Sequence, residues 1–102
     1  MTRLKLAIDH MHNMHRVLEH PKNAAKGHWR GESIDSLLDH LDREVDEFKA
    51  AIWGLQHGEP RQRVIDEGAD VSNIVAMIVD NISNSGVRNE DKKLGEVPAF
   101  QG

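Results

Sequence analysis

The sequence contains no cysteine and no tyrosine, and aromatic residues make up only 4% of its 102 positions. The absence of cysteine excludes disulfide bonds, thiolate zinc sites and a cysteine nucleophile. The low aromatic content argues against a β-sandwich, because strands are enriched in aromatic and β-branched residues. The remaining composition, 38% hydrophobic and 29% charged, is typical of a folded helical protein, so we expect an all-α fold.

An excess of basic residues is also missing, since the formal net charge is -4 and the isoelectric point is near 5.9. Binding to a nucleic-acid backbone normally requires a concentrated basic surface, so no nucleic-acid partner is expected. Because no long apolar run resembles a signal peptide or a membrane span, we expect a cytoplasmic protein without a membrane partner. We expect one domain, 1–102, whose small core favours oligomerisation.

Apolar residues recur at helical spacing in three segments, and we predict a helix for each. The first covers 3–19, the second 33–56 with Ser33 as its N-cap, and the third 60–83 with Pro60 in its first turn. The three apolar stripes consist of Leu4, Ala7, Ile8, Met11, Met14 and Leu18; Ile34, Leu37, Leu38, Leu41, Val45, Phe48, Ile52 and Leu55; and Val64, Gly68, Val71, Val75, Ile78 and Ile82.

The third predicted helix has a wider apolar surface than one partner helix can cover, because Ile74, Met77 and Val79 flank its stripe. We therefore expect it to lie centrally and to reach a subunit interface. Residues 19–33 are predicted to form a connection, and residues 87–102 to contain one short helical turn. The expected fold is three main helices plus a short C-terminal segment, with a core completed by dimerisation.

Two pairs of carboxylates repeat one spacing, with Glu44 and Glu47 in the second predicted helix and Glu67 and Asp70 in the third. Residues three apart share a helical face, and both pairs flank an apolar stripe. Antiparallel packing would bring the four carboxylates together, and a hard divalent cation such as Mg²⁺ would relieve their repulsion. The alternative, ordinary solvated charges on helix surfaces, is equally compatible with the spacing.

The sequences "EVDE" at 44–47 and "EGAD" at 67–70 are separated by nineteen residues. They resemble the Glu-x-x-Glu and Glu-x-x-Asp motifs of the all-α nucleoside triphosphate pyrophosphohydrolases, the MazG-like superfamily. The resemblance covers residues 32–82. Arg43 departs from the pattern, because many members carry an acidic residue there, and this leaves the number of metal ions and the phosphate geometry open.

The resemblance implies a MazG-like helical bundle that forms a homodimer or a dimer of dimers. It implies that a nucleoside triphosphate is cleaved between its α- and β-phosphates, with Mg²⁺ as cofactor and Mn²⁺ as a substitute. Glu44, Glu47, Glu67 and Asp70 are then the metal ligands, and Glu47 is the candidate catalytic residue that orients or deprotonates the attacking water. The alternative is a non-enzymatic helical module that binds a nucleotide or a protein partner.

The candidates for substrate binding have side chains that can contact phosphate, sugar or base: Lys26, His28, Trp29, Asn73, Lys92 and Lys93. Trp29 can stack on a base, and Asn73 lies one turn after the second motif, where its amide can hydrogen-bond sugar or base. Four of these residues also have a structural alternative: core packing for Trp29, a polar helix position for Asn73 and solvent exposure for Lys92 and Lys93.

Histidines offer a different kind of metal site, because His10, His12, His15 and His20 crowd the first predicted helix. Their angular positions scatter around that helix, with His15 alone inside the apolar stripe, so a convergent histidine site is not expected. A carboxylate-bridged di-iron site is disfavoured as well, because no histidine follows either carboxylate motif at Glu-x-x-His spacing.

Overall fold

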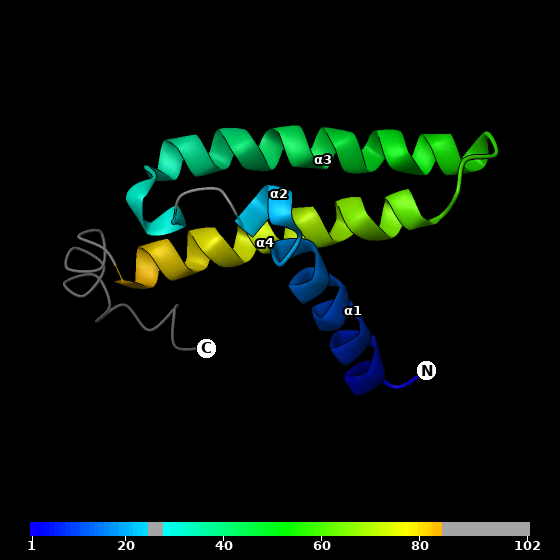
Figure 1. The fold of residues 1–102 in the computed structure, drawn as a ribbon, viewed down its shortest axis with the longest axis horizontal. Helices are drawn as coiled ribbons and strands as arrows, with labels where there is room; N and C mark the ends of the chain where they lie inside the picture. The colour runs from blue at the N-terminus through cyan, green and yellow to red at the C-terminus, as the bar shows by residue number, and fades with distance from the viewer. Residues whose placement is uncertain (25–27, 85–102) are drawn as a thin grey trace.

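The computed structural model describes residues 1–24 and 28–84, and every regular element within these ranges is helical (Figure 1). The all-α prediction is confirmed for this part of the chain. Predictions for Lys26, Lys92 and Lys93 fall outside the described residues. The elements are α1 (Arg3–Leu18), α2 (Pro21–Ala24), the 3-10 turn η1 (Trp29–Gly31), α3 (Ile34–Gln56) and α4 (Gln62–Asn84).

The helix starts follow from local hydrogen bonding. Ser33 is the N-cap of α3, as predicted, because its hydroxyl oxygen accepts a hydrogen bond from the Ser36 backbone N–H at 3.1 Å. Thr2 caps α1 in the same way. α4 begins at Gln62, so Pro60, which was predicted to lie in the first turn of this helix, precedes it by two residues.

A tight turn joins α3 to α4 and makes the two helices an antiparallel hairpin (Figure 1). Gly58 has a φ of +97°, a conformation that side chains with a Cβ rarely adopt. The Gly54 carbonyl accepts hydrogen bonds from the backbone N–H groups of His57 and Glu59, both at 2.9 Å. The chain thereby reverses within a few residues, which places the two carboxylate motifs on adjacent helices.

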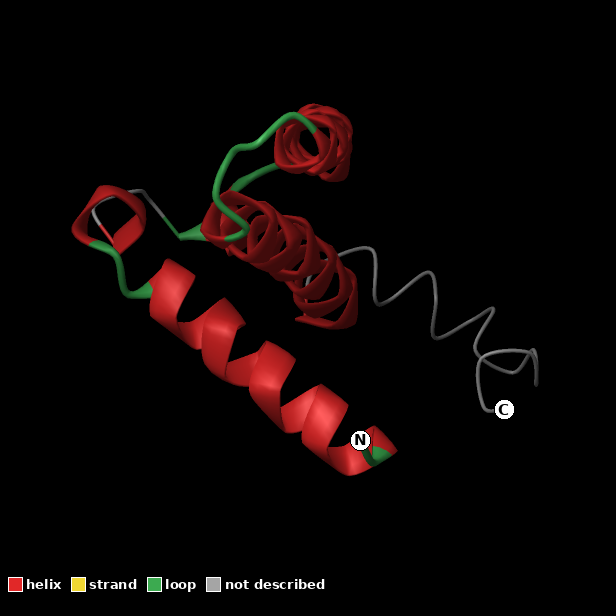
Figure 2. Ribbon diagram, turned by 90° about the vertical axis from the view of Figure 1, so that its right-hand side faces the viewer, coloured by secondary structure: helices red, strands yellow, loops and turns green. Residues whose placement is uncertain are grey.

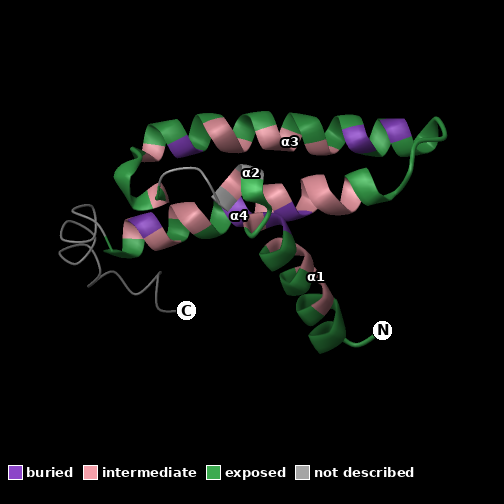
Figure 3. Ribbon diagram, viewed as in Figure 1, coloured by how far each residue is buried: buried purple, intermediate pink, exposed green. Residues whose placement is uncertain are grey.

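α4 is the central helix, as predicted from its wide apolar surface. It packs against α3, α1 and η1, whereas α1 and α3 do not contact each other within the described ranges. Figure 2 shows α4 between the other two long helices. The buried apolar residues come from the three long helices (Figure 3): Val17 of α1, Leu37 and Ala51 of α3, and Ala69 and Ile74 of α4. None of the described helices is long and apolar enough to cross a membrane.

The N-terminal end of α1 extends away from α4 (Figure 1), and most of the apolar stripe of α1 is exposed (Figure 3). Leu4 is 69% exposed and Met11 is 56% exposed. Exposed apolar residues also occur on the other two long helices, so the full set spans all three: Leu4, Leu6, Ile8, Met11, Leu38, Ile52, Trp53, Leu55, Val75 and Val79. A regular stripe in the sequence therefore does not mean that one chain covers it.

The histidine inside the apolar stripe of α1 is not the one that contacts α4. His15 is exposed and lies 3.4 Å from Glu19, whereas His10 Nε2 forms a 2.7 Å hydrogen bond with the Ser72 hydroxyl of α4. The reason is that α1 packs on α4 by a face that contains the buried Val17 and, seven residues earlier, the polar His10. Helical spacing alone could not show which face α4 would cover.

Candidate metal centre

The motif "EGAD" places a glycine next to its first carboxylate, and this glycine lets α3 and α4 approach closely. A Cβ added to Gly68 would lie 3.3 Å from Phe48 Cε1 on α3. Because the helices are close at this level, carboxylates at the edge of the contact can meet across it.

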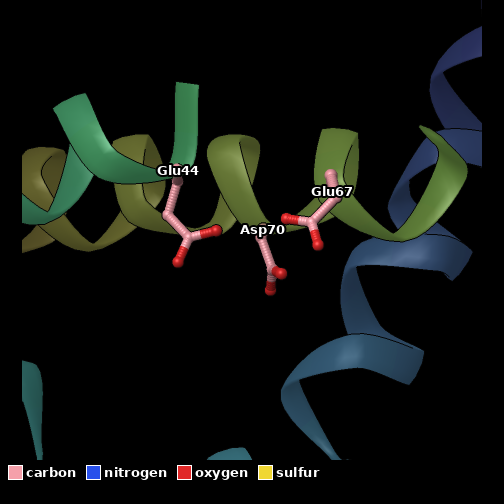
Figure 4. A group of neighbouring side chains, drawn as sticks. All are labelled: Glu44, Glu67 and Asp70. Atoms are coloured by element: carbon pink, nitrogen blue, oxygen red, sulfur yellow. The ribbon is translucent and has the colours of Figure 1, made fainter. Parts of the chain in front are cut away.

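Three of the four predicted ligands converge at this level. Each of Glu44, Glu67 and Asp70 offers a carboxylate oxygen, and these atoms all lie within 4.8 Å of one another. Figure 4 shows the Glu44 side chain extending from α3 toward Glu67 and Asp70 of α4. All three residues are partly buried. Glu47 is exposed and is not one of the converging three, but it lies close enough to Glu67 to form a hydrogen bond with it.

The cluster raises the pKa of Glu67 to about 7. Burial is the largest cause, followed by the negative charges of Glu47, Asp70 and Glu44. In addition, Glu67 Oε2 is buried and has no hydrogen-bond partner among the described residues. The predicted repulsion between the two motifs is therefore present in the fold, and it is strongest at Glu67.

The residues of this cluster suit a hard divalent cation. Carboxylate oxygens are the ligands that Mg²⁺ and Mn²⁺ prefer, and positive charge would remove the repulsion that raises the pKa of Glu67. The 4.8 Å limit on the oxygen separations is close to the roughly 4.2 Å that separates opposite ligands of an octahedral Mg²⁺. The three oxygens could therefore bind one such ion after small side-chain movements.

A histidine that sequence reasoning did not consider supports Glu44. His40 lies one turn earlier on α3, and its Nε2 is 3.2 Å from Glu44 Oε1. The two side chains are 25% and 14% exposed, so the contact is shielded from water. Hydrogen bonds of this kind orient a ligand carboxylate. The i,i+4 spacing was visible in the sequence and could have identified the pair.

A cleft of about 250 Å³ adjoins the cluster on the side of α1. Its wall contains residues from the end of α1, the segment after it and α4: Arg16, Val17, His20, Asn23, Asp66, Glu67 and Asp70. Arg16 Nη2 donates a 2.7 Å hydrogen bond to Asp66 Oδ1. Burial acts to raise the pKa of Asp66, but the hydrogen bonds from Arg16 and Gln62 hold that pKa below its usual value. Sequence reasoning missed Arg16 and His20.

The sequence candidates His28 and Trp29 lie elsewhere on the same chain. Their rings stack with centroids 4.0 Å apart, and Trp29 Nε1 donates a 2.7 Å hydrogen bond to Asp80 Oδ2. Asp80 is ten residues beyond Asp70, which is about 15 Å along a helix. Within one chain, the structure therefore does not bring these two rings to the carboxylate cluster.

Trp29 belongs to a second group of polar contacts, which we call the Asp80 clamp: Trp29, Arg30, Glu32, Asp80, Asn81 and Asn84. Arg30 donates from Nε and Nη2 to the two Asp80 oxygens, at 2.9 and 3.0 Å. Asn81 Nδ2 donates to the Trp29 and Glu32 carbonyls, both at 3.0 Å. Hydrogen bonds from Arg30 and Trp29 hold the pKa of Asp80 well below its usual value. The clamp ties the segment before α3 onto α4.

Asn73, the remaining sequence candidate, lies in the contact between α1 and α4. It is 4% exposed, and its Nδ2 donates a 3.1 Å hydrogen bond to the Met14 carbonyl. Its Oδ1 is buried without a hydrogen-bond partner among the described residues. This environment supports the structural alternative for Asn73, and a substrate contact stays a prediction.

Comparisons with protein-family models, curated proteins and solved structures find no match for this chain. Membership of the MazG-like superfamily therefore stays a prediction from the two carboxylate motifs.

Proposed function

We propose that this chain is a MazG-like, Mg²⁺-dependent nucleoside triphosphate pyrophosphohydrolase. The observation that supports the proposal is the convergence of Glu44 from α3 with Glu67 and Asp70 from α4, whose oxygens lie within 4.8 Å of one another. Ordinary solvated helix charges would not be expected to meet across a helix contact or to raise the pKa of Glu67 to about 7. The cluster has the chemistry of an all-oxygen site for Mg²⁺ or Mn²⁺.

In the proposed reaction, a water oxygen attacks the α-phosphorus, the bond from that phosphorus to the bridging oxygen breaks, and pyrophosphate leaves. The cation, when bound, supplies positive charge that stabilises the phosphates and makes a water more acidic. Glu44, Glu67 and Asp70 would hold it, and His40 orients Glu44. Glu47, exposed beside Glu67, is the group we assign to accept the proton of the water.

We also propose that the protein acts as a homodimer or a dimer of dimers. The exposed apolar residues of α1, α3 and α4 support this, because a single chain leaves apolar surface uncovered on every long helix. Sedimentation at micromolar concentration is the direct measurement. A single species of 11.5 kDa would contradict the proposed assembly.

The enzyme proposal is tested by measuring pyrophosphate release from a panel of canonical and modified nucleoside triphosphates with Mg²⁺ or Mn²⁺. The wild-type protein should release pyrophosphate from at least one of them, and Glu67→Gln should not. Glu59→Gln is the matched control, because Glu59 is exposed, pairs with Arg63 at 3.2 Å and lies in the turn before α4. It should retain wild-type activity.

Failure of the wild-type protein to release pyrophosphate from any triphosphate would overturn the enzyme proposal. The non-enzymatic alternative, a helical module that binds a nucleotide or a protein partner, would then be preferred. Equal activity of wild-type protein and Glu67→Gln would instead show that hydrolysis does not depend on this carboxylate cluster.

A further inference from the structure

The cleft beside the carboxylate cluster has sides of opposite charge. Asp66, Glu67 and Asp70 line it from α4, and Arg16 and His20 line it from the end of α1 and the segment that follows. Its volume of about 250 Å³ is below the roughly 300–1,000 Å³ of sites that enclose a whole small-molecule ligand. The cleft therefore suits a compact part of a ligand, one that carries negative charge next to a bound cation.

The Arg16 guanidinium has hydrogen-bond donors to offer such a group. Its contacts with Asp66 at 2.7 Å and with Asn13 at 3.4 Å both use Nη2. Nε and Nη1 form no hydrogen bond with the described residues, and the side chain is 50% exposed. The Asp66 contact holds the guanidinium in place at the cleft, and its remaining donors form the planar fork that matches phosphate oxygens.

We propose that Arg16, with His20 in the same cleft, binds the phosphate chain of the substrate while the carboxylate cluster binds the accompanying divalent cation. The inference rests on the proposed function, because it assigns the ligand as a metal-bound polyphosphate. It differs from the sequence prediction, in which Lys26, Lys92 and Lys93 were the cationic residues near the phosphates. The nucleoside would extend out of the cleft.

The first experiment measures binding of inorganic pyrophosphate in the presence of Mg²⁺ by titration calorimetry. Arg16→Gln should weaken this binding by about 10-fold to 100-fold, the usual effect of losing a charge-assisted hydrogen bond to phosphate. Arg63→Gln is the matched control, because Arg63 is an exposed arginine that pairs with Glu59 and does not line the cleft. Its pyrophosphate affinity should equal that of the wild-type protein.

A second variant tests the same inference through an expected increase in pyrophosphate affinity. Asp66→Asn removes the carboxylate that binds Arg16 and lessens the negative charge near the phosphates, so pyrophosphate should bind several-fold more tightly. In the Arg16→Gln background, most of this gain should disappear, because the two residues act as a pair. An equal gain in both backgrounds would mean that Arg16 does not bind the phosphates.

Unchanged pyrophosphate affinity in Arg16→Gln, with a wild-type circular dichroism spectrum, would overturn the inference. If Arg16→Gln does not fold, Arg16→Lys replaces it: this variant keeps the charge, loses the planar fork and should still bind pyrophosphate more weakly. Pyrophosphate release by wild-type protein separates the two proposals. If the wild-type protein hydrolyses a triphosphate but Arg16→Gln leaves pyrophosphate affinity unchanged, only this inference is rejected. If Arg16→Gln weakens pyrophosphate binding but the wild-type protein hydrolyses no triphosphate, only the enzyme proposal is rejected.

Discussion

Two of the carboxylates of helix α4, Glu67 and Asp80, lie thirteen residues apart in opposite environments. Asp80 accepts hydrogen bonds from Arg30, Trp29 and Asn84, and these bonds, that of Arg30 above all, hold its pKa below the usual range. Glu67 has an oxygen buried without a partner among the described residues and lies among other carboxylates, so its pKa rises to about 7. On the same helix, neighbouring groups therefore stabilise the ionised form of Asp80 and destabilise the ionised form of Glu67.

The comparison distinguishes contacts that stabilise the fold from a cluster of like charges that destabilises it. The Asp80 clamp fixes the segment before α3 and needs nothing from outside the chain. The carboxylate cluster is unfavourable until positive charge arrives, which is the expected property of a cation site and not of a structural contact.

The largest difference should be in catalysis, tested with two matched Asp→Asn substitutions on α4. Asp70→Asn should lower Mg²⁺-supported kcat by at least about 100-fold, because it removes a charged ligand of the proposed cation site. Asp80→Asn should change kcat by less than about threefold at a temperature where it is folded, because Asp80 lies far from the cluster. Initial rates of pyrophosphate release provide the measurement. Similar losses in both variants would remove the functional distinction between the two regions.

The raised pKa of Glu67 predicts how the stability of the metal-free protein changes with pH. From pH 4.5 to about 7 the unfolded chain has released the Glu67 proton while the folded chain keeps it, so stability falls as pH rises. Relative to Glu67→Gln, the wild-type protein should lose about 2 kcal/mol across this interval, after allowance for partial solvent screening. Urea unfolding in EDTA at several pH values measures this loss.

Saturating Mg²⁺ gives the control for that measurement. Because a bound cation favours the ionised carboxylate, it should abolish the wild-type loss between pH 4.5 and 7 and should have little effect in Glu67→Gln. A constant difference between the two proteins at all pH values in EDTA would show that Glu67 titrates normally.

Substitution of Asn81 tests the Asp80 clamp without altering a charge. It is 4% exposed and donates to the Trp29 and Glu32 carbonyls at 3.0 Å. Asn81→Ala should cost about 1–2 kcal/mol of unfolding free energy, because buried carbonyls lose their donor. Mg²⁺ affinity per folded molecule should be unchanged, which calorimetry can check. A selective loss of Mg²⁺ binding would mean that the clamp and the cluster are coupled.

Asp80→Asn should give the smallest change in stability, because the Arg30 contact is at the surface, where ion pairs contribute little. Its pH dependence has the opposite sign to that of Glu67. A lowered pKa means that the contribution is complete above the ordinary Asp value near 4 and is lost as pH falls through the folded-state value. Melting temperatures of wild type and Asp80→Asn should therefore converge below pH 4. A gap that widens in acid would contradict this assignment.

The features that could be read from the sequence are those set by short-range periodicity and local hydrogen bonding. The 3.6-residue period located the three long helices, and Ser33 marked the start of α3, as the structure confirms. The two carboxylate motifs suggested where a site would form. These inferences hold because helix phase and capping depend on residues within a few positions of each other.

Only the tertiary structure decided which residues from different helices meet. It brought Glu44 to Glu67 and Asp70, left Glu47 at the edge, and placed Arg16 rather than Trp29 near the cluster. It also turned His10, not His15, toward α4. These outcomes depend on the rotation and crossing angle of packed helices, which are set by contacts between residues as far apart in sequence as Arg16 and Asp66. No local pattern along the chain specifies those angles.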